Sequence, residues 1–192
     1  MTDEPRRVGV FGGTFDPPHR GHVQVVTEVA DRLGLHEVVW VPAGRSPHKP
    51  DAPLTAAHVR AGMVRCAVGG DRRFSVNELE LERTGLSYMI DTLEALSEEH
   101  ASSDLFLIIG NDQYQAFERW RSPDRIRSLA TVVVMDRDGE GGATAPDIAV
   151  DVLPVDVSSS EVRRRVRQGR SISALVPGCV AEWIEREGLY TS

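Results

Sequence analysis

Two histidines in a glycine-rich segment near the start of the chain could bind a phosphate group. Residues 12–22 read Gly-Gly-Thr-Phe-Asp-Pro-Pro-His-Arg-Gly-His, directly after an apolar run at residues 8–11. Glycines let a backbone approach a phosphate closely because no Cβ intervenes, and imidazoles donate hydrogen bonds to phosphoryl oxygens. His19 and His22 would share one face of a helix that begins here, beside the unpaired N–H groups of its first turn. The spacing predicts a phosphate site, and the plainer interpretation is a glycine turn with two surface histidines.

The elements that would position these histidines are strands that alternate with helices. Several apolar, β-branched runs are continuous, which is typical of parallel strands covered on both faces. We expect strands at residues 7–11, 38–42, 74–79, 105–109, 131–135 and 148–153, and helices at residues 23–33, 56–68, 88–100 and 124–129. The alternation predicts an α/β fold with a parallel sheet, flanking helices and right-handed crossovers. Ligands of such sheets bind at the carboxyl ends of strands, where the turn at residues 12–22 begins.

Helix-start signals mark the later part of the chain. Ser122 before a proline is typical of an N-cap, and Ser87 could cap the helix at residues 88–100. Ser158 with Glu161 forms a capping-box pattern for a helix through residue 168, and Pro177 precedes a final helix at residues 178–187. These signals predict a small C-terminal helical part. Without repeats or a long linker, residues 1–192 are expected to form a single domain.

Composition excludes several classes of protein. The chain has 192 residues, 41% hydrophobic and 27% charged, which are ordinary globular values. Its net charge of −7 argues against wrapping a long nucleic acid, and no apolar run is long enough to span a membrane. The N-terminus is polar, so nothing indicates a signal peptide. Cys66 and Cys179 lie far apart without metal-ligand spacing, so we expect reduced thiols in a cytoplasmic protein.

The turn at residues 12–22 resembles the signature Gly-Gly-Thr-Phe-Asp-Pro-x-His-x-Gly-His of the nucleotidylyltransferase superfamily. In particular it is similar to that of the bacterial nicotinate-nucleotide adenylyltransferases. The resemblance implies a Rossmann-like fold, ATP with Mg²⁺ as the adenylyl donor, and no covalent enzyme intermediate. It also implies that the turn binds ATP through Gly12, Gly13, Thr14, Phe15, His19 and His22.

Two further segments resemble phosphate-binding parts of the family. Lys49 lies in Ser-Pro-His-Lys-Pro at residues 46–50, and a lysine there could offset charge that gathers in the transition state. A solvated surface lysine is the alternative. Residues 157–163 resemble the family's Ile-Ser-Ser-Thr-x-Ile-Arg, so Ser158, Ser159 and Arg163 could bind the β- and γ-phosphates at a helix start. A capped helix without a ligand is the alternative there.

Two segments resemble the acceptor site of the family. Tyr88 and Met89 lie where the family has Ser-Tyr-Thr, whose backbone holds the pyridine carboxylate, and Met89 replaces the threonine. Trp120 resembles the tryptophan that stacks on the pyridine ring, and a core role is its competitor. We assign Trp40 and Trp183 to core or helix packing.

The remaining resemblances concern loop residues after two strands. Gly110 and Asp112 lie where the family has Gly-Ala-Asp, with Asn111 as a departure, and Asp112 could accept hydrogen bonds from ribose hydroxyls. Arg137 lies in Arg-Asp-Gly where the family has Arg-Pro-Gly, with Asp138 in place of proline. Arg137 could meet the acceptor or product phosphate, or could be an exposed loop arginine.

The expected activity is transfer of AMP from ATP to nicotinate mononucleotide in NAD biosynthesis. His19, His22, Lys49 and Arg163 would be catalytic, with His19 and His22 at the α-phosphate. Mg²⁺ is expected to arrive with ATP, since no carboxylate cluster suggests a protein-built cage. Alternatives are the amide mononucleotide or phosphopantetheine as acceptor, and a nucleotide-binding regulator without turnover. A homo-oligomer is left open.

Overall fold

Six parallel strands form the centre of the protein, in the order β3-β2-β1-β4-β5-β6. The computed structural model describes residues 4–44, 55–136 and 147–191. The strands are β1 (Arg6–Gly13), β2 (Glu37–Pro42), β3 (Phe74–Val76), β4 (Ser103–Gly110), β5 (Ala130–Asp136) and β6 (Ile148–Asp151). The α/β prediction is confirmed, and each expected strand exists. The expectation of a single domain stays a prediction.

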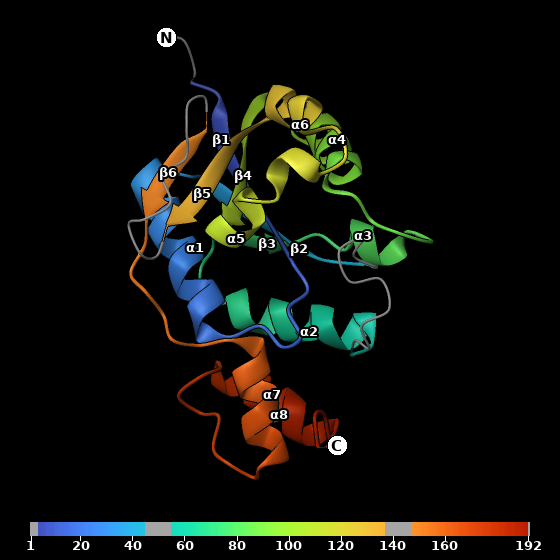
Figure 1. Cartoon of the computed structure of the whole chain (residues 1–192), viewed down its shortest axis with the longest axis vertical. Helices are drawn as coiled ribbons and strands as arrows, with labels where there is room; N and C mark the ends of the chain where they lie inside the picture. Colours follow the sequence, from blue (N-terminus) through green and yellow to red (C-terminus); the bar gives the residue numbers. More distant parts are fainter. Residues whose placement is uncertain (1–3, 45–54, 137–146, 192) are drawn as a thin grey trace.

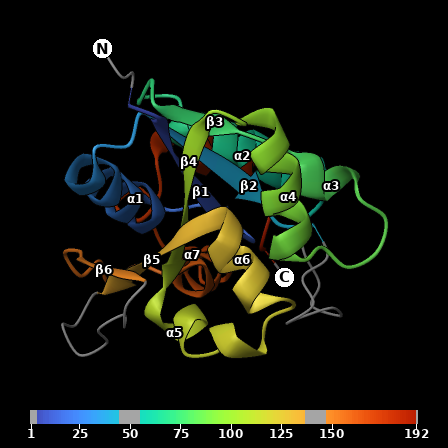
Figure 2. The ribbon, with the colours of Figure 1, turned by 90° about the horizontal axis from the view of Figure 1, so that it is seen from above.

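Helices cover both faces of the sheet, as the continuous apolar runs predicted. Helices α1 (Arg20–Leu33) and α2 (Ala57–Val68) pack on one face, around fully buried Trp40. Helices α4 (Met89–Glu99) and α6 (Pro123–Leu129) pack on the other, over Leu107 and Val134. Figure 2 shows α1 on one side of the strands and α4 with α6 on the other. Each strand therefore buries side chains on both faces.

The strand order reverses direction at the middle of the sheet. From β1 the chain moves outward through β2 to β3, and then returns to β4 on the other side of β1. As a result, α1 leaves β1 toward one face, whereas α5 (Asn111–Tyr114), η1 (Phe117–Arg119) and α6 leave β4 toward the other (Figure 1). Segments that diverge in this way open a crevice at the carboxyl edge of the sheet.

The last two helices, α7 (Ser159–Arg167) and α8 (Gly178–Arg186), lie beyond the sheet against α2 (Figure 1). Their shared apolar cluster includes Met63, Val162 and Val180, and the ring of Trp183 lies directly over Gly62. The expected C-terminal helical part is therefore confirmed, as is packing for both Trp40 and Trp183. No helix in the described ranges is long and apolar enough to cross a membrane.

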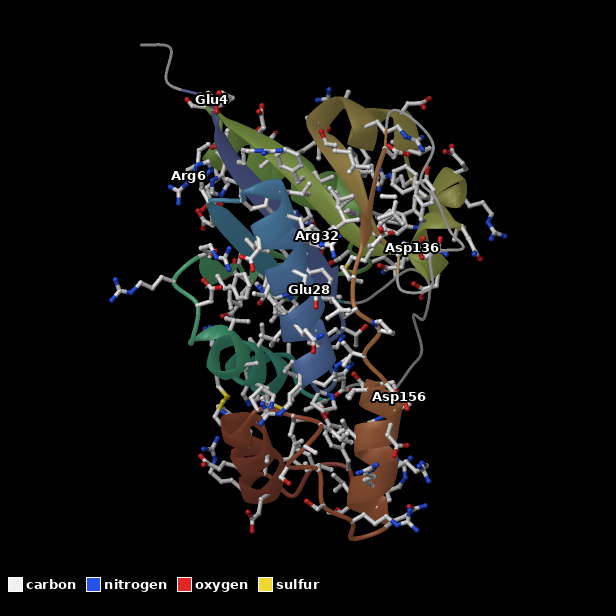
Figure 3. All side chains as sticks on the ribbon, turned by 90° about the vertical axis from the view of Figure 1, so that its left-hand side faces the viewer. Glu4, Arg6, Glu28, Arg32, Asp136 and Asp156 are labelled. Carbon is white, nitrogen blue, oxygen red and sulfur yellow. A yellow bond between two sulfur atoms is a disulfide. The ribbon has the colours of Figure 1, made fainter. Side chains whose placement is uncertain are left out.

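The expectation of two reduced thiols is wrong. Cys66 of α2 and Cys179 of α8 form a disulfide, visible as a yellow bond between these helices in Figure 3. The two residues are 113 positions apart in sequence, and packing of α8 on α2 brings their Cα atoms to 6.1 Å. This distance lies within the range that a disulfide spans. Sequence spacing carried no sign of that contact.

Several element boundaries differ from expectation for local reasons. β3 ends at Val76, because Asn77 Oδ1 accepts the Leu79 N–H and starts the short helix α3 (Leu79–Glu82). Ser122 precedes α6 but makes no cap hydrogen bond, since its own φ is +56°. Ser87 is not a cap either, because its hydroxyl donates to the Glu80 carbonyl. Ser158 does cap α7, where its Oγ accepts the N–H of Glu161.

Candidate active site

The paired histidines form the N-terminal cap of α1. His19 Nδ1 accepts the His22 N–H at 3.3 Å, and His22 Nδ1 accepts the His19 N–H at 3.2 Å. The two rings stack with centroids 3.6 Å apart. Because each Nδ1 is an acceptor, a neutral ring carries its proton on Nε2. Each ring can therefore offer an Nε2–H to a phosphoryl oxygen. The predicted shared face is confirmed, and the helix begins three residues earlier than expected.

The turn between β1 and α1 is held from inside the core. The ring of Phe15 is 2% exposed and packs against Phe11, Trp40 and the edge of His22, at centroid distances of 5.5, 5.3 and 5.2 Å. Phe15 has a positive φ of 49°, a strained value for an aromatic residue that this packing maintains. The Phe15 side chain thus anchors the turn, so that any contact with ATP there would use its backbone.

Helix α7 reaches the same turn. Ser159 Oγ donates to the Pro17 carbonyl at 2.8 Å, and Arg163 Nη1 donates to the Asp16 carbonyl at 2.6 Å. The start of α7 therefore lies beside the first turn of α1, and two helix N-termini meet at one place. Both contribute unpaired N–H groups and positive dipole ends that favour an anion. Since the Ser159 hydroxyl donates to Pro17, the backbone N–H groups are the donors that this helix start offers.

A pocket of about 350 Å³ opens next to the turn. Its walls come from β1, the segment after β2, the start of α4 and the segment between η1 and α6. The lining residues are Gly12, Gly13, Thr14, Ala43, Glu80, Ser87, Tyr88, Met89, Gln113, Arg119, Trp120, Arg121 and Ile126. Six residues predicted for ATP or the acceptor thus line one pocket. An added Cβ on Gly12 would lie 2.7 Å from the Met89 terminal methyl group, so this glycine makes room for Met89.

Aromatic and cationic side chains gather on the α6 side of this pocket. Trp120 packs on Phe117 with ring centroids 5.3 Å apart and ring planes inclined by 49°, so its indole is held against the core. The guanidinium of Arg121 lies over the Tyr88 ring at 4.8 Å from the centroid. Arg119 also lines the pocket. Flat rings with nearby cations suit an aromatic ligand that carries negative charge.

A buried carboxyl group forms the floor of the pocket. Glu80 is 5% exposed, and its Oε1 accepts the Thr92 hydroxyl at 2.7 Å. Its Oε2 accepts the Gly44 N–H at 3.4 Å. Burial raises the pKa of Glu80 above its ordinary value, and these hydrogen bonds reduce the shift. A carboxyl group held closer to its neutral form repels an anionic ligand less than an ordinary carboxylate.

The remaining predicted residues occupy different positions relative to this pocket. Gly110 and Asp112 lie at the carboxyl end of β4, beside pocket residue Gln113, whose Oε1 accepts the Gly110 N–H at 3.3 Å. Lys49 and Arg137 lie outside the described residues, so their roles stay predictions.

Sequence reasoning missed several residues of the site. Three of them line the pocket without belonging to a recognised motif: Glu80, Gln113 and Arg121. Arg119 lies in the segment that resembles the family at residues 117–120, but no role was predicted for it. Glu80 sits in an alternating Glu-Leu run that reads as an exposed strand end, and only tertiary packing buries it. Arg119 and Arg121 flank Trp120 in the sequence. Their position beside a predicted site residue was the pattern that could have indicated them.

The chain is similar in sequence to known proteins. Residues 10–165 match the family model described as Cytidylyltransferase-like. A protein of Shouchella clausii (strain KSM-K16), named "Probable nicotinate-nucleotide adenylyltransferase", is 38% identical over 186 residues, covering 96% of this chain and 97% of its own. One of Tropheryma whipplei (strain Twist), with the same name, is 42% identical over 185 residues, covering 95% and 98%.

A solved structure shares the fold. It is described as Plasmodium falciparum nicotinic acid mononucleotide adenylyltransferase complexed with APC, and superposes with a TM-score of 0.78 over 96% of this chain and 97% of that one. Its sequence identity of 18% supports the likeness of fold alone. The expected Rossmann-like, nucleotidylyltransferase-type architecture is thereby confirmed.

Proposed function

The chain belongs to the nicotinate-nucleotide adenylyltransferases, and from this premise we propose that it transfers the AMP of ATP to nicotinate mononucleotide. The products are nicotinate adenine dinucleotide and pyrophosphate. The observation that carries the proposal is the pair of stacked imidazoles at the start of α1, beside a pocket lined by aromatic rings and arginines.

The reaction is an in-line displacement at phosphorus. An oxygen of the acceptor's phosphate attacks the α-phosphorus of ATP and forms a new P–O bond. The bond from the α-phosphorus to the bridging β-oxygen breaks, and pyrophosphate leaves with the electron pair. Because the attacking phosphate is already ionised near neutral pH, positioning and charge stabilisation supply most of the catalysis.

The phosphate-binding roles go to the two helix starts. His19 and His22 donate to oxygens of the α-phosphate, and the N–H groups at Ser158 and Ser159 receive the β- and γ-phosphates. Arg163 and Lys49 offset charge on the leaving pyrophosphate. Arg163 Nη1 donates to the turn backbone at Asp16, and this contact supports a role for its guanidinium at the phosphates.

Mg²⁺ enters as part of the ATP substrate, where it neutralises charge on the phosphate oxygens. Within residues 4–44, 55–136 and 147–191, no group of three or more His, Cys, Asp or Glu residues lies in position to hold a metal ion. The ion would be held by the phosphates of ATP, while this chain binds the nucleotide.

The acceptor lies in the pocket between Tyr88 and Trp120. Trp120 stacks on the pyridine ring, and the backbone at Met89 donates to the pyridine carboxylate. Asp112, beside Gly110, accepts from ribose hydroxyls of the nucleotide, and Arg137 meets the acceptor phosphate. Support comes from the packing of the Trp120 indole against Phe117 and from its position in the pocket wall. A cytoplasmic setting and a homo-oligomer stay predictions.

The direct test is replacement of His22 by alanine. His22→Ala is expected to lower kcat by about 10²- to 10³-fold, since it removes a donor to the charge that develops at phosphorus. Pyrophosphate release from ATP measures the rate, and circular dichroism checks the fold, because the cap of α1 is also lost. The control is His36→Ala, which changes an exposed histidine just before β2 whose Nδ1 accepts the Arg7 N–H. Folded His22→Ala protein with near-normal turnover would remove the assigned role.

The same assay separates the acceptors. Nicotinate mononucleotide, its amide and phosphopantetheine are supplied side by side with ATP, and the acid is expected to give the highest kcat/KM. Preference for the amide or for phosphopantetheine would replace the proposed acceptor. Nucleotide binding without pyrophosphate release from any acceptor would indicate a regulator.

A further inference from the structure

A buried carboxylate in the phosphate-binding turn is hydrogen-bonded by the C-terminal end of the chain. Asp16 is 6% exposed. Its Oδ1 accepts the Tyr190 hydroxyl at 2.5 Å across 174 sequence positions, and its Oδ2 accepts the Thr55 N–H at 3.2 Å. Burial, with the hydrogen bond to Asp16, raises the pKa of Tyr190, so the phenol keeps its proton and remains a donor. Such charge-assisted bonds are among the stronger hydrogen bonds in proteins.

Two further side chains complete what we name the Asp16 network: Asp16, Thr55, Arg60 and Tyr190. Arg60 is 3% exposed, and it donates from Nη1 to the Thr14 carbonyl at 2.8 Å and from Nε to the Thr55 carbonyl at 3.0 Å. The Thr55 hydroxyl donates to the Tyr190 oxygen at 3.2 Å. The buried positive charge of Arg60 compensates the negative charge of Asp16, since an isolated buried charge is costly.

The network holds the turn at the residues that immediately precede His19. Asp16 lies three positions before His19, and its own carbonyl accepts from Arg163. Tyr190 comes just after α8 and has a φ of +62°, a conformation that an aromatic residue adopts only where its surroundings impose it. Since α8 packs on α2 and is joined to it by the disulfide, the phenol is presented to Asp16 from a fixed support.

We propose that Tyr190 is a positioning residue, which acts through Asp16 to hold the turn so that His19 and His22 meet the phosphoryl group. The Tyr190 hydroxyl donates to Asp16 and accepts from the Thr55 hydroxyl, so its effect passes through the geometry of the turn rather than through substrate contact. Misplacement by ~1 Å can lower a rate by ~100-fold. This inference rests on the proposed function of the two histidines.

The test removes only the hydroxyl, with Tyr190→Phe. We expect kcat to fall about tenfold, by the geometric sensitivity just given, while KM for ATP and for nicotinate mononucleotide changes less than about twofold. The matched control is Tyr114→Phe, which removes a tyrosine hydroxyl that donates to Asp147 at 3.0 Å, and it is expected to keep the wild-type kcat. Thermal melting verifies that both variants are folded.

A double-mutant cycle with Asp16→Asn tests whether the effect passes through Asp16. If it does, the double variant loses about as much kcat as Asp16→Asn alone. A readout without substrate comes from the ¹⁵N chemical shifts of the imidazoles of His19 and His22, which are expected to move in Tyr190→Phe and to stay in Tyr114→Phe.

Three results would overturn the proposal: unchanged kcat in Tyr190→Phe, additive losses in the cycle, or a loss of kcat explained by a lower melting temperature with unmoved imidazole shifts. Failure of the proposed function has a different result: the wild-type protein itself would not release pyrophosphate from ATP with nicotinate mononucleotide. The imidazole shifts still report on Tyr190 in that case.

Discussion

At the scale of single residues, Glu80 both lines the pocket and holds two segments of the chain together. The pocket is the one that we propose for an anionic acceptor, and Glu80 accepts hydrogen bonds from Thr92 and Gly44 that tie α4 to the segment after β2. A glutamine would repel an anion less, but its amide nitrogen could not accept the second hydrogen bond. A carboxyl group with a raised pKa keeps both acceptors at a reduced charge.

Replacement Glu80→Gln is expected to change how stability depends on pH. Between the ordinary pKa near 4.5 and the raised value, the folded protein keeps a proton that the unfolded chain has lost. The free energy of unfolding contributed by Glu80 therefore falls as pH rises through that window. Urea unfolding between pH 4 and pH 7 should show wild-type stability declining relative to the variant. Exposed Glu82→Gln is the control, and a constant difference between wild type and Glu80→Gln would contradict this account.

Prediction of residues from the sequence worked where one continuous segment builds the contact. The two histidine rings stack on each other, and Tyr88, Met89 and Trp120 line one pocket, while their roles toward a ligand stay predictions. Contacts between distant segments could not be read in this way. The hydroxyl of Tyr190 reaches the turn across 174 positions, and no local pattern distinguishes it from an ordinary tail residue.

At the scale of elements, the first turn of α1 explains why a glycine separates the two histidines. An added Cβ on Gly21 would lie 3.1 Å from His19 Nδ1 and 3.2 Å from Val155. Those distances are shorter than ordinary van der Waals contacts, so either the ring or the segment after β6 must move. Gly21 is therefore required by close packing under the imidazole rather than by an unusual backbone conformation.

Gly21→Ala is expected to separate stability from activity. Alanine favours a helix over glycine by up to ~1 kcal/mol, and this gain offsets the cost of the close contacts of the added methyl group. The melting temperature should therefore change little. The displaced His19 ring should lower kcat about threefold to tenfold, because phosphoryl transfer depends on alignment. Steady-state kinetics and thermal melting measure both effects. Gly178→Ala is a matched control at the start of another helix, where nothing lies within 4 Å of the added Cβ. Equal kcat in the two variants would show that the His19 ring tolerates the methyl group.

Elements were largely predictable, because strand and helix patterns are local. The predicted boundaries were wrong where a side chain forms a hydrogen bond outside the element to which it was assigned. Ser87 donates to the Glu80 carbonyl instead of capping α4, and the turn at Asn77 shortens β3. The order of the strands was not predictable from periodicity, since the same runs could be arranged in several sheets.

At the scale of the whole molecule, the C-terminal helices support the turn between β1 and α1, where we propose that the nucleotide binds. Helix α8 is attached to α2 by an apolar cluster and by the bond between Cys66 and Cys179. Helix α7 contacts the turn through Ser159 and Arg163. Chain segments that end the sequence therefore complete a site that begins near its start.

Reduction of the disulfide is expected to destabilise the protein by about 2–4 kcal/mol, since the bond constrains a long loop in the unfolded chain. Cys66 and Cys179 are 113 positions apart. Thermal melting with and without a thiol reductant measures the effect, and the double variant Cys66→Ala/Cys179→Ala should melt near the reduced protein and ignore the reductant. An oxidised protein that melts no higher than the reduced one would contradict this expectation.

The reversal of strand order at β1 and β4 divides the site into two separately supported halves. The cradle that we propose for the nucleotide is carried by β1, α1 and α7, whereas Trp120 and its flanking arginines, on the proposed acceptor side, are carried by the connection from β4 to β5. Insertions or exchanges between residues 111 and 122 would reshape the acceptor wall and leave the phosphate-binding half in place. Donor chemistry and acceptor choice can thus diverge independently, which makes this connection the natural segment to exchange when a new acceptor is sought.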